Sequence, residues 1–292
     1  MISIVVCSVN PTLSEALLEN ISDTAGVPYE VICVDNSTGR YTIFEAYNYG
    51  ASVAKYDLLC FMHEDILFHT RGWGEIVAGK LRDNEVGVIG VAGAVYKPAS
   101  PSPWWISDTE DRTAYHRLNI LQHFSTGVKR QRATAGSGPW DEVVVLDGVW
   151  LCCRRDVWLR TPFDGQRYKG FHFYDLDFSF SVHAGGFRNF VSQEILIEHF
   201  SAGNMDTNWI RGAAVFHKKW RKVLPGRVGD IPAREMEGLE LSAARNFLRI
   251  MTYNRYHDLR LWLKYWLKTA SHDPLKRETV RSLMQYGRTY FK

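Results

Sequence analysis

The sequence predicts an α/β fold in which a mostly parallel sheet is flanked by helices and followed by a helical C-terminal region. Three observations predict it. Up to about residue 91, short apolar runs alternate with helical patterns, as in βαβ units. The alternation resumes near residue 143, and the pattern from residue 232 onward is helical. A chain of 292 residues can bury one large domain with an appendage. We therefore expect a domain over residues 1–225 and a helical region over residues 226–292.

The predicted parallel strands are four short apolar runs, at residues 3–9, 29–34, 57–62 and 86–91. Between the first two, Thr12 and Glu15 have the spacing of a capping box at the start of a helix. Leu17 and Ile21 then lie on one face of that helix, which we expect to pack on the sheet. The next two crossovers are predicted as helices at residues 44–54 and 73–81.

The pattern is interrupted over residues 92–142, where proline, tryptophan and glycine are frequent. We expect a long loop there, because such stretches in compact domains are usually functional. After it we expect a buried strand from Val143, a helix from Tyr174, and edge strands near residues 187–191 and 195–197. The helical pattern of the C-terminal region has a break at Asp273 and Pro274.

The composition is that of an ordinary globular protein, with 46% hydrophobic and 23% charged residues. The N-terminus is predicted as a first strand and not as a signal peptide. No run reaches the roughly 18 apolar residues of a spanning helix. We expect the five cysteines to be reduced, since their spacing fits neither a zinc site nor a set of disulfides. These features predict a cytoplasmic protein.

Polar residues follow three of the predicted strands, at the sheet edge where ligands bind in open α/β folds. Ser8 and Val9 end the first strand, Asp35 follows the second, and the third is followed by His63, Glu64 and Asp65. No GxGxxG or P-loop motif is present, which argues against a dinucleotide site and a P-loop site. Carboxylates here suit a hard divalent cation that bridges to phosphate oxygens, although a polar turn is the simpler reading of this tripeptide.

Further along, Asp175 and Asp177 open the helix that begins at Tyr174. Acidic residues are favoured at helix starts by the helix dipole, so capping alone explains both. A carboxylate at this position is also a candidate general base for a hydroxyl group. His199 ends a later apolar run. Alone it reads as a core or surface histidine, but together with Asp65 it completes a candidate metal site.

Six motifs occur in a distinctive order: IVVCSVN, VICVDNST, AYNYGASVAKYDLLCFMHEDI, LDGVWLCCRRDVW, FHFYDLDFS and IEHFSAG. In this order the sequence resembles the family 2 glycosyltransferases of the GT-A fold. It looks closest to the subgroup named after a streptomycin biosynthesis protein, which carries an H-x-D motif. The resemblance covers residues 2–203. It implies a GT-A domain that binds a nucleotide sugar.

The resemblance also implies roles for individual residues. Asp65 matches the metal-holding acid of the family's D-x-D motif, His63 takes the place of its first Asp, and His199 matches a downstream metal ligand. Imidazole suits Mn²⁺ better than Mg²⁺, so we expect manganese. Asp175 matches the catalytic base of inverting members, although Tyr174 stands where Glu is usual. The donor-binding residues are predicted to be Ser8, Val9, Asp35, Asn48, Glu64 and Gly148.

We place the acceptor beside the long loop of residues 92–142, with Trp104 and Trp105 as faces for sugar stacking, and we add Trp150 and Asp177. Burial in the core is the alternative for the tryptophans.

The predicted function is metal-dependent sugar transfer, with inversion, to a hydroxyl of a glycan or lipid-linked glycan in polysaccharide biosynthesis. The alternative is a catalytically silent module that binds a nucleotide sugar or glycan. A sugar nucleotidyltransferase would have a glycine-rich basic loop after the first strand, and none is present. The acidic remainder of the chain and the lack of a recognition motif argue against nucleic-acid binding.

The net charge of +3 is unevenly distributed: from Arg245 onward there are 11 Lys and Arg against 3 Asp and Glu. In this region one helical stripe carries Leu259, Trp262, Leu263, Trp266 and Leu267. Packing on the domain is one explanation of such a stripe. Peripheral contact with the inner face of an anionic membrane is the other.

Overall fold

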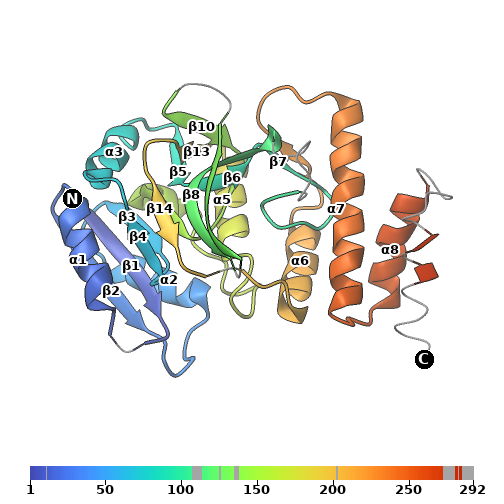
Figure 1. The fold of residues 1–292 in the computed structure, drawn as a ribbon, viewed down its shortest axis with the longest axis horizontal. Coiled ribbons are helices and arrows are strands. Elements are labelled where there is room, and N and C mark those ends of the chain that lie inside the picture. Colours follow the sequence, from blue (N-terminus) through green and yellow to red (C-terminus); the bar gives the residue numbers. More distant parts are fainter. Residues whose placement is uncertain are drawn as a thin grey trace.

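A computed structural model describes residues 1–10, 12–106, 114–124, 126–134, 138–201, 203–271, 280–281 and 283–284. Its main sheet has seven strands in the order β10-β13-β5-β12-β3-β1-β2 (Figure 1). Their bounds are β1 (Ile2–Ser8), β2 (Tyr29–Asp35), β3 (Leu58–Met62), β5 (Val86–Gly90), β10 (Trp140–Val143), β12 (Trp150–Arg154) and β13 (Arg188–Ser192).

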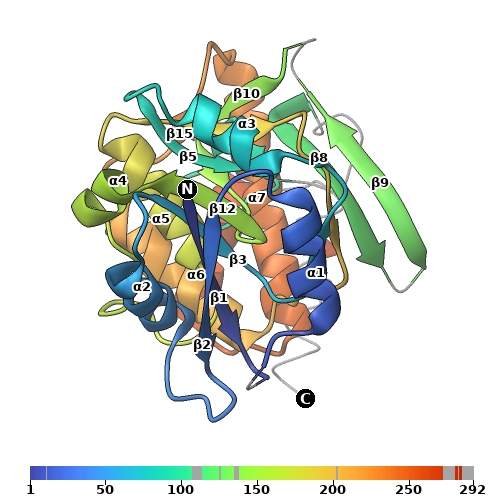
Figure 2. The ribbon, with the colours of Figure 1, turned by 90° about the vertical axis from the view of Figure 1, so that its left-hand side faces the viewer.

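Helices cover both faces of this sheet, which confirms the predicted α/β class (Figure 2). The helices are α1 (Glu15–Thr24), α2 (Ile43–Val53), α3 (Trp73–Lys80), α4 (Arg155–Arg160), α5 (Tyr174–Ala184), α6 (Thr207–Lys219), α7 (Ala233–Tyr253) and α8 (Leu259–Ala270). Alternate residues of β1 explain the two layers. Ile4 belongs to one core cluster with α1 and α3, whereas Val5 belongs to another with α2 and α5. Strands buried on both faces are mostly apolar, as the sequence of β1 is.

The strands of the main sheet bring the predicted polar residues to one edge. β1 runs parallel to both β2 and β3, so Ser8 lies opposite Asp35, and Val6 lies opposite Met62, the last residue of β3. The interior strand β12 is antiparallel to β3 and β5. The segment that leads into β12 therefore lies beside the end of β3.

The start of α1 differs from the prediction. The helix begins at Glu15, and the hydroxyl of Ser14 accepts a hydrogen bond from the amide of Leu17. The capping box predicted for Thr12 and Glu15 is therefore wrong. A capping box does occur at α2, between Thr42 and Glu45.

The prediction of a long loop over residues 92–142 is also wrong, because much of this segment forms strands. A second sheet has the order β11-β6-β8-β14-β4, with β9 paired to β8. Its strands are β4 (Ile66–Phe68), β6 (Ala92–Ala94), β8 (His116–Phe124), β9 (Gly127–Ala133), β11 (Val145–Leu146) and β14 (Ile197–His199). β7 (Tyr96–Lys97) pairs separately with β15 (Gly226–Arg227). Two predicted edge strands are interior, because β13 lies between β10 and β5, and β14 between β8 and β4.

The helices α7 and α8 pack against each other and on the rest of the molecule (Figure 1). Trp262 and Tyr265 of α8 are buried in the core cluster that also contains Phe247 of α7 and Phe216 of α6. Leu263 and Leu267 remain exposed. Among the described residues, no helix is both long and apolar enough to cross a membrane. The predicted break at Asp273 and Pro274 lies outside the described residues.

Candidate active site

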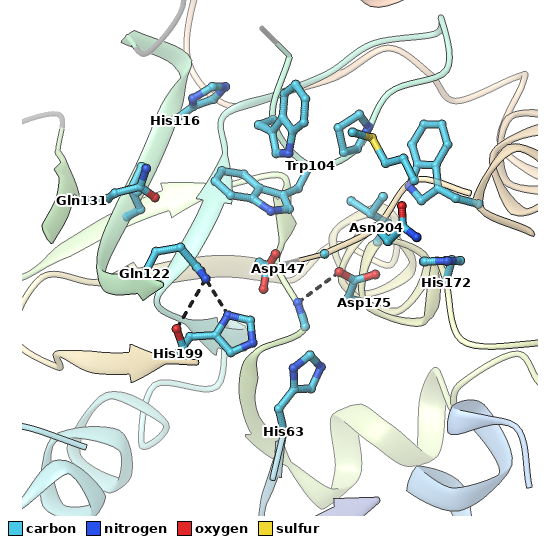
Figure 3. Close-up of a pocket in the computed structure, with 18 of the residues that line it drawn as sticks. His63, Trp104, His116, Gln122, Gln131, Asp147, His172, Asp175, His199 and Asn204 are labelled. Atoms are coloured by element: carbon cyan, nitrogen blue, oxygen red, sulfur yellow. Dashed lines mark hydrogen bonds between the residues drawn. The ribbon is translucent and has the colours of Figure 1, made fainter. Parts of the chain in front are cut away.

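A cavity of about 870 Å³ opens at the edge where β3 ends. The residues after β3, the segment before β12, the N-terminus of α5, the strand β8 and the end of β14 all contribute to its lining, through His63, Asp147, Asp175, Gln122 and His199. Trp104 lies across the cavity from His63 (Figure 3). The cavity thus gathers residues from five distant parts of the sequence.

His63, Asp65 and His199 form a candidate metal site beside this cavity. Each offers one ligand atom, and these atoms lie within 4.8 Å of one another. Nδ1 of His63 is 3.8 Å and Nε2 of His199 is 3.6 Å from Oδ1 of Asp65. The amide of Phe200 also donates to the carbonyl of Asp65 at 3.1 Å, which fixes β14 beside the end of β3.

The tautomer of His199 follows from Gln122. The side-chain nitrogen of Gln122 faces the carbonyl oxygens of His123 (3.0 Å) and Ser201 (2.7 Å), so its oxygen is the atom 3.0 Å from Nδ1 of His199. An amide oxygen only accepts, so Nδ1 of His199 carries the proton. In the neutral ring, Nε2 is then the unprotonated nitrogen, and it lies 3.6 Å from Oδ1 of Asp65.

Tyr174 fixes the tautomer of His63 in the same way. The tyrosine hydroxyl donates its single proton to the carbonyl of Gly148 at 2.9 Å, so it accepts from Nε2 of His63 at 2.7 Å. Nδ1 of His63 is therefore unprotonated toward Asp65. Burial and the neighbouring His199 also lower the pKa of His63, which keeps the ring neutral. Two imidazoles, each held by a hydrogen bond through one ring nitrogen with the other nitrogen toward Asp65, and one carboxylate suit a divalent cation.

Asp175 lines the cavity at the N-terminus of α5, where its carboxylate accepts a hydrogen bond from the amide of Gly148 at 3.0 Å. Burial, and then the negative charge of Asp147, raises the pKa of Asp175 to about 7. A carboxyl group with this pKa can take a proton near neutral pH.

Phe173, just before the helix, has a φ of 72°, which is rare for an aromatic residue. Its ring fits against Gly212 of α6, where a Cβ atom would come within 2.7 Å.

The chain matches the family described as "Glycosyltransferase like family" over residues 3–219. It belongs to this family. No curated protein sequence matches it.

Solved structures of low sequence identity share the fold of this family member. The TarS structure of S. aureus (residues 1–349) has 10% identity and a TM-score of 0.54, over 99% of this chain and 88% of that one. TarS has also been solved in complex with UDP and with UDP-GlcNAc. The structure of GalNAc-T7 with UDP, GalNAc and Mn²⁺ has 12% identity and a TM-score of 0.50, over 94% of this chain and 58% of that one.

In this glycosyltransferase-like chain, Ser8, Val9, Asp35 and Glu64 lie at strand ends on the same edge of the sheet and do not line the cavity. The carboxylate of Glu64 accepts hydrogen bonds from the hydroxyl of Ser8 and from the amide of Val9 (3.3 Å), which ties the end of β1 to that of β3. Asp35 accepts from the amide of Ser37 at 2.9 Å. Of the predicted acceptor residues, Trp104 and Trp105 line the cavity.

Three predicted site residues lie away from the cavity. Asn48 bonds to the indole of Trp158 (3.0 Å) and to the backbone of Phe163, so it fixes the chain after α4. The ring of Trp150 is fully buried against other aromatic side chains. Asp177 is buried as well. It follows Asp175 by two residues on the same helix, so its side chain points away from the direction of the Asp175 side chain. It accepts hydrogen bonds from Tyr168, Lys219 and Trp220. We correct these three assignments to structural roles.

Three residues that act on the predicted site residues are not predicted from the sequence. Asp147 stands in the same LDG motif as Gly148, and its carboxylate was a signal that could have been used. Tyr174 departs from the family pattern, and its contact with His63 joins residues too far apart in the sequence to be predicted. Gln122 lies in the segment predicted as a loop, so nothing in the sequence pointed to it.

Proposed function

We propose that the protein transfers a sugar from a nucleotide-sugar donor, UDP-linked or linked to another nucleoside diphosphate, to a hydroxyl of a glycan or lipid-linked glycan. The observation that carries this proposal is the convergence of His63, Asp65 and His199 with Asp175 at one cavity. The family match and the likeness to TarS and GalNAc-T7 support it. The placement in the streptomycin-related subgroup remains a proposal.

His63, Asp65 and His199 would hold a divalent cation, which neutralises charge on a departing nucleoside diphosphate when bound. Two nitrogen ligands favour Mn²⁺ over Mg²⁺. The GalNAc-T7 structure, with UDP and Mn²⁺ together, supports this choice. Ser8, Val9, Asp35 and Glu64 at the neighbouring strand ends would bind the nucleoside.

Asp175 would act as the general base in a single inverting displacement. Its carboxylate faces the cavity and, above about pH 7, can take the proton of the attacking hydroxyl. Gly148, whose amide donates to Asp175, would lie beside the donor sugar. Trp104 and Trp105 on the facing wall would contact the acceptor.

A thermal-shift screen of nucleotides and nucleotide sugars tests the binding part of the proposal, since ligands of the folded state raise its melting temperature. We expect one nucleoside diphosphate and its sugar to raise it only when Mn²⁺ is added. Asp65→Ala should lose this shift. The matched control is Asp57→Ala, whose carboxylate is exposed, and it should keep the shift. A screen in which no nucleotide acts with Mn²⁺ would contradict the proposal.

Release of the nucleoside diphosphate distinguishes an enzyme from a silent binding module. With Mn²⁺ and the donor found in the screen, we expect slow release even with water as acceptor. A chain that binds this donor but releases no diphosphate, with or without added glycans, would be a binding module.

We also propose that residues 226–292 bring a cytoplasmic enzyme to the inner face of an anionic membrane. Leu259, Leu263 and Leu267 of α8 are 43%, 37% and 58% exposed, and Arg260 and Lys264 lie on the same helix. Such a surface suits the interface of an anionic bilayer. Flotation with vesicles rich in phosphatidylglycerol should recover the native chain and lose the Leu263→Asp, Leu267→Asp double variant. Leu159→Asp, at an exposed leucine of α4, is the control, and equal recovery of all three chains would refute membrane contact.

A further inference from the structure

Residues 98–106, which follow β7, carry part of the cavity wall and form no helix or strand. They include the cavity-lining residues Pro103, Trp104 and Trp105. Most of the segment is buried, with Ser100 and Ile106 fully so. Buried loops are unusual, because their backbone polar groups need partners inside the protein. The partners of this loop therefore determine where the wall stands.

Glu240 on α7 supplies one set of partners. Its carboxylate accepts hydrogen bonds from the amide of Ala99 (2.6 Å) and from the amide (3.0 Å) and hydroxyl (2.8 Å) of Ser100. It also accepts from Nζ of Lys268 on α8 (2.7 Å) and from the hydroxyl of Tyr96 on β7 (3.1 Å). A carboxylate has about four lone-pair sites, so this one is saturated. One side chain thus joins the loop to both C-terminal helices.

Lys97 supplies the second set. Its buried Nζ donates to the carbonyl (2.6 Å) and hydroxyl (2.6 Å) of Ser102 and to the carbonyl of Pro103 (3.3 Å). These are the residues just before Trp104. On the far side the ring of Trp104 meets that of His116 edge to face, and the amide of Ile106 donates to the same imidazole at 3.1 Å. The chain on both sides of Trp104 and Trp105 is therefore held, and the ring of Trp104 is held by His116.

Apolar packing adds a third connection. Tyr96 and Ile106, at the two ends of the loop, form a small core cluster with Ile231 and with Leu239 of α7. Leu239 is the neighbour of Glu240 in the sequence. The first half of α7 therefore lies against the loop with both an apolar surface and a charged group.

We infer that Glu240 is a positioning residue for the acceptor side of the site. It does not line the cavity. It acts through residues 98–106, whose place sets where the rings of Trp104 and Trp105 stand on the wall facing the metal ligands. That this wall receives the acceptor sugar rests on the proposed function, whereas the positioning of the two rings does not. In this arrangement the C-terminal helices contribute to acceptor binding without touching the acceptor.

Fluorine NMR of the full chain labelled with 5-fluorotryptophan tests the positioning. The signals of Trp104 and Trp105 among the 10 tryptophans are assigned with Trp104→Phe and Trp105→Phe. Glu240→Gln keeps the side-chain shape but puts an amide donor against other donors. We expect it to shift or broaden these two signals and to leave that of Trp73, which lies on α3 against Phe68 and Trp150, in place. Unchanged Trp104 and Trp105 signals would overturn the inference.

Two further variants serve as controls for this experiment. Glu237→Gln, at an exposed residue of the same helix, should leave all signals in place. If Glu240→Gln does not fold, Ser100→Ala removes the hydrogen bond from the Ser100 hydroxyl to Glu240 and the one that this hydroxyl accepts from Lys268, and it should still move the Trp104 signal. No movement in a folded Ser100→Ala chain would then count against the inference.

Titration with methyl β-glucoside, methyl β-galactoside and N-acetylglucosamine tests the acceptor assignment. We expect at least one of these sugars to move the Trp104 or Trp105 signal of the native chain. The Glu240→Gln variant should bind that sugar with an apparent Kd at least fivefold higher. Manganese-dependent hydrolysis of the donor should stay within twofold of the native rate. If no sugar moves either signal, the wall is not an acceptor site. If the native chain hydrolyses no donor, the proposed function fails, and the fluorine spectra still decide the role of Glu240.

Discussion

At the scale of single residues, Asp175 connects the structure to a pH dependence. Burial and Asp147 raise its pKa to about 7, and a base must be deprotonated to act. We therefore expect kcat/KM to fall about tenfold per pH unit below about pH 7. Asp147→Asn removes a neighbouring negative charge, lowers the pKa of Asp175 and should move this fall to lower pH. Profiles of rate against pH for both chains measure it, and a fall that stays in place would contradict the role of Asp147.

The same carboxyl group should lower the free energy of unfolding at neutral pH. Its pKa is higher in the folded chain than the 3.8 of a free carboxyl. The folded state therefore holds the proton more tightly, and this contribution to stability is lost as pH rises from about 4 to about 7. Asp175→Asn should lower turnover by about two to four decades and melt at the same or a higher temperature at pH 8.

The control for this variant is Asp177→Asn, which disturbs a buried ion pair with Lys219 and should lower the melting temperature. Native turnover in Asp175→Asn would remove Asp175 from the role of base.

The Tyr174 hydroxyl should matter for the metal although it is not a ligand. Tyr174→Phe removes the group that holds Nε2 of His63, and loss of such a partner typically weakens metal binding about 10–100-fold. Calorimetric titration with Mn²⁺ measures this. Tyr168→Phe removes a buried hydroxyl bonded to Asp177 instead, so it should lower stability and keep the metal affinity. Equal affinities in all three chains would show that His63 needs no such support.

At the scale of elements, local sequence patterns predicted the strands and helices that pair or pack with elements close to them in the sequence. The first strands and the starts of α2, α3 and α5 lie within two residues of their predicted places. In contrast, two of the three strands that pair with β8, namely β14 and β6, lie far from it in the sequence, whereas β9 follows it directly. Pairing with distant strands has no local signature, and the nearby prolines and tryptophans favoured a loop. Gln122 was missed for this reason.

The packing of α2 on the sheet can be tested at Gly50. A Cβ atom there would come within 2.2 Å of the side chain of Val5 on β1. Gly50→Ala should therefore destabilise the protein by about 1–3 kcal/mol through overpacking. Gly79→Ala on α3 is the matched change, since a Cβ atom there meets nothing within 4 Å. It should stabilise the protein by about 0.5–1 kcal/mol. Urea unfolding measures both, and the same sign for the two variants would contradict this packing.

At the scale of the whole molecule, the order of the motifs predicted more than any one of them. His63, Asp65, Asp175 and His199 were each ambiguous alone, and their joint resemblance to a family pointed to one site. The structure brings these four residues together at one cavity or beside it. Asn48, Trp150 and Asp177 belong to the same motifs and serve the core instead. A motif therefore identifies a segment, whereas the direction of each side chain depends on the packing around it.

The relation of the C-terminal helices to the rest of the chain gives the last prediction. Phe247, Trp262 and Tyr265 share one core cluster with Trp209 and Phe216 of α6. Burying one large apolar side chain contributes about 1.5–3 kcal/mol, and a whole domain is stable by only about 5–15 kcal/mol. A chain of residues 1–225 should therefore lack a cooperative thermal transition by circular dichroism, whereas the full chain shows a single one. A folded 1–225 chain that binds the donor would instead make residues 226–292 a separate domain, and Glu240 could then be deleted without loss of donor binding.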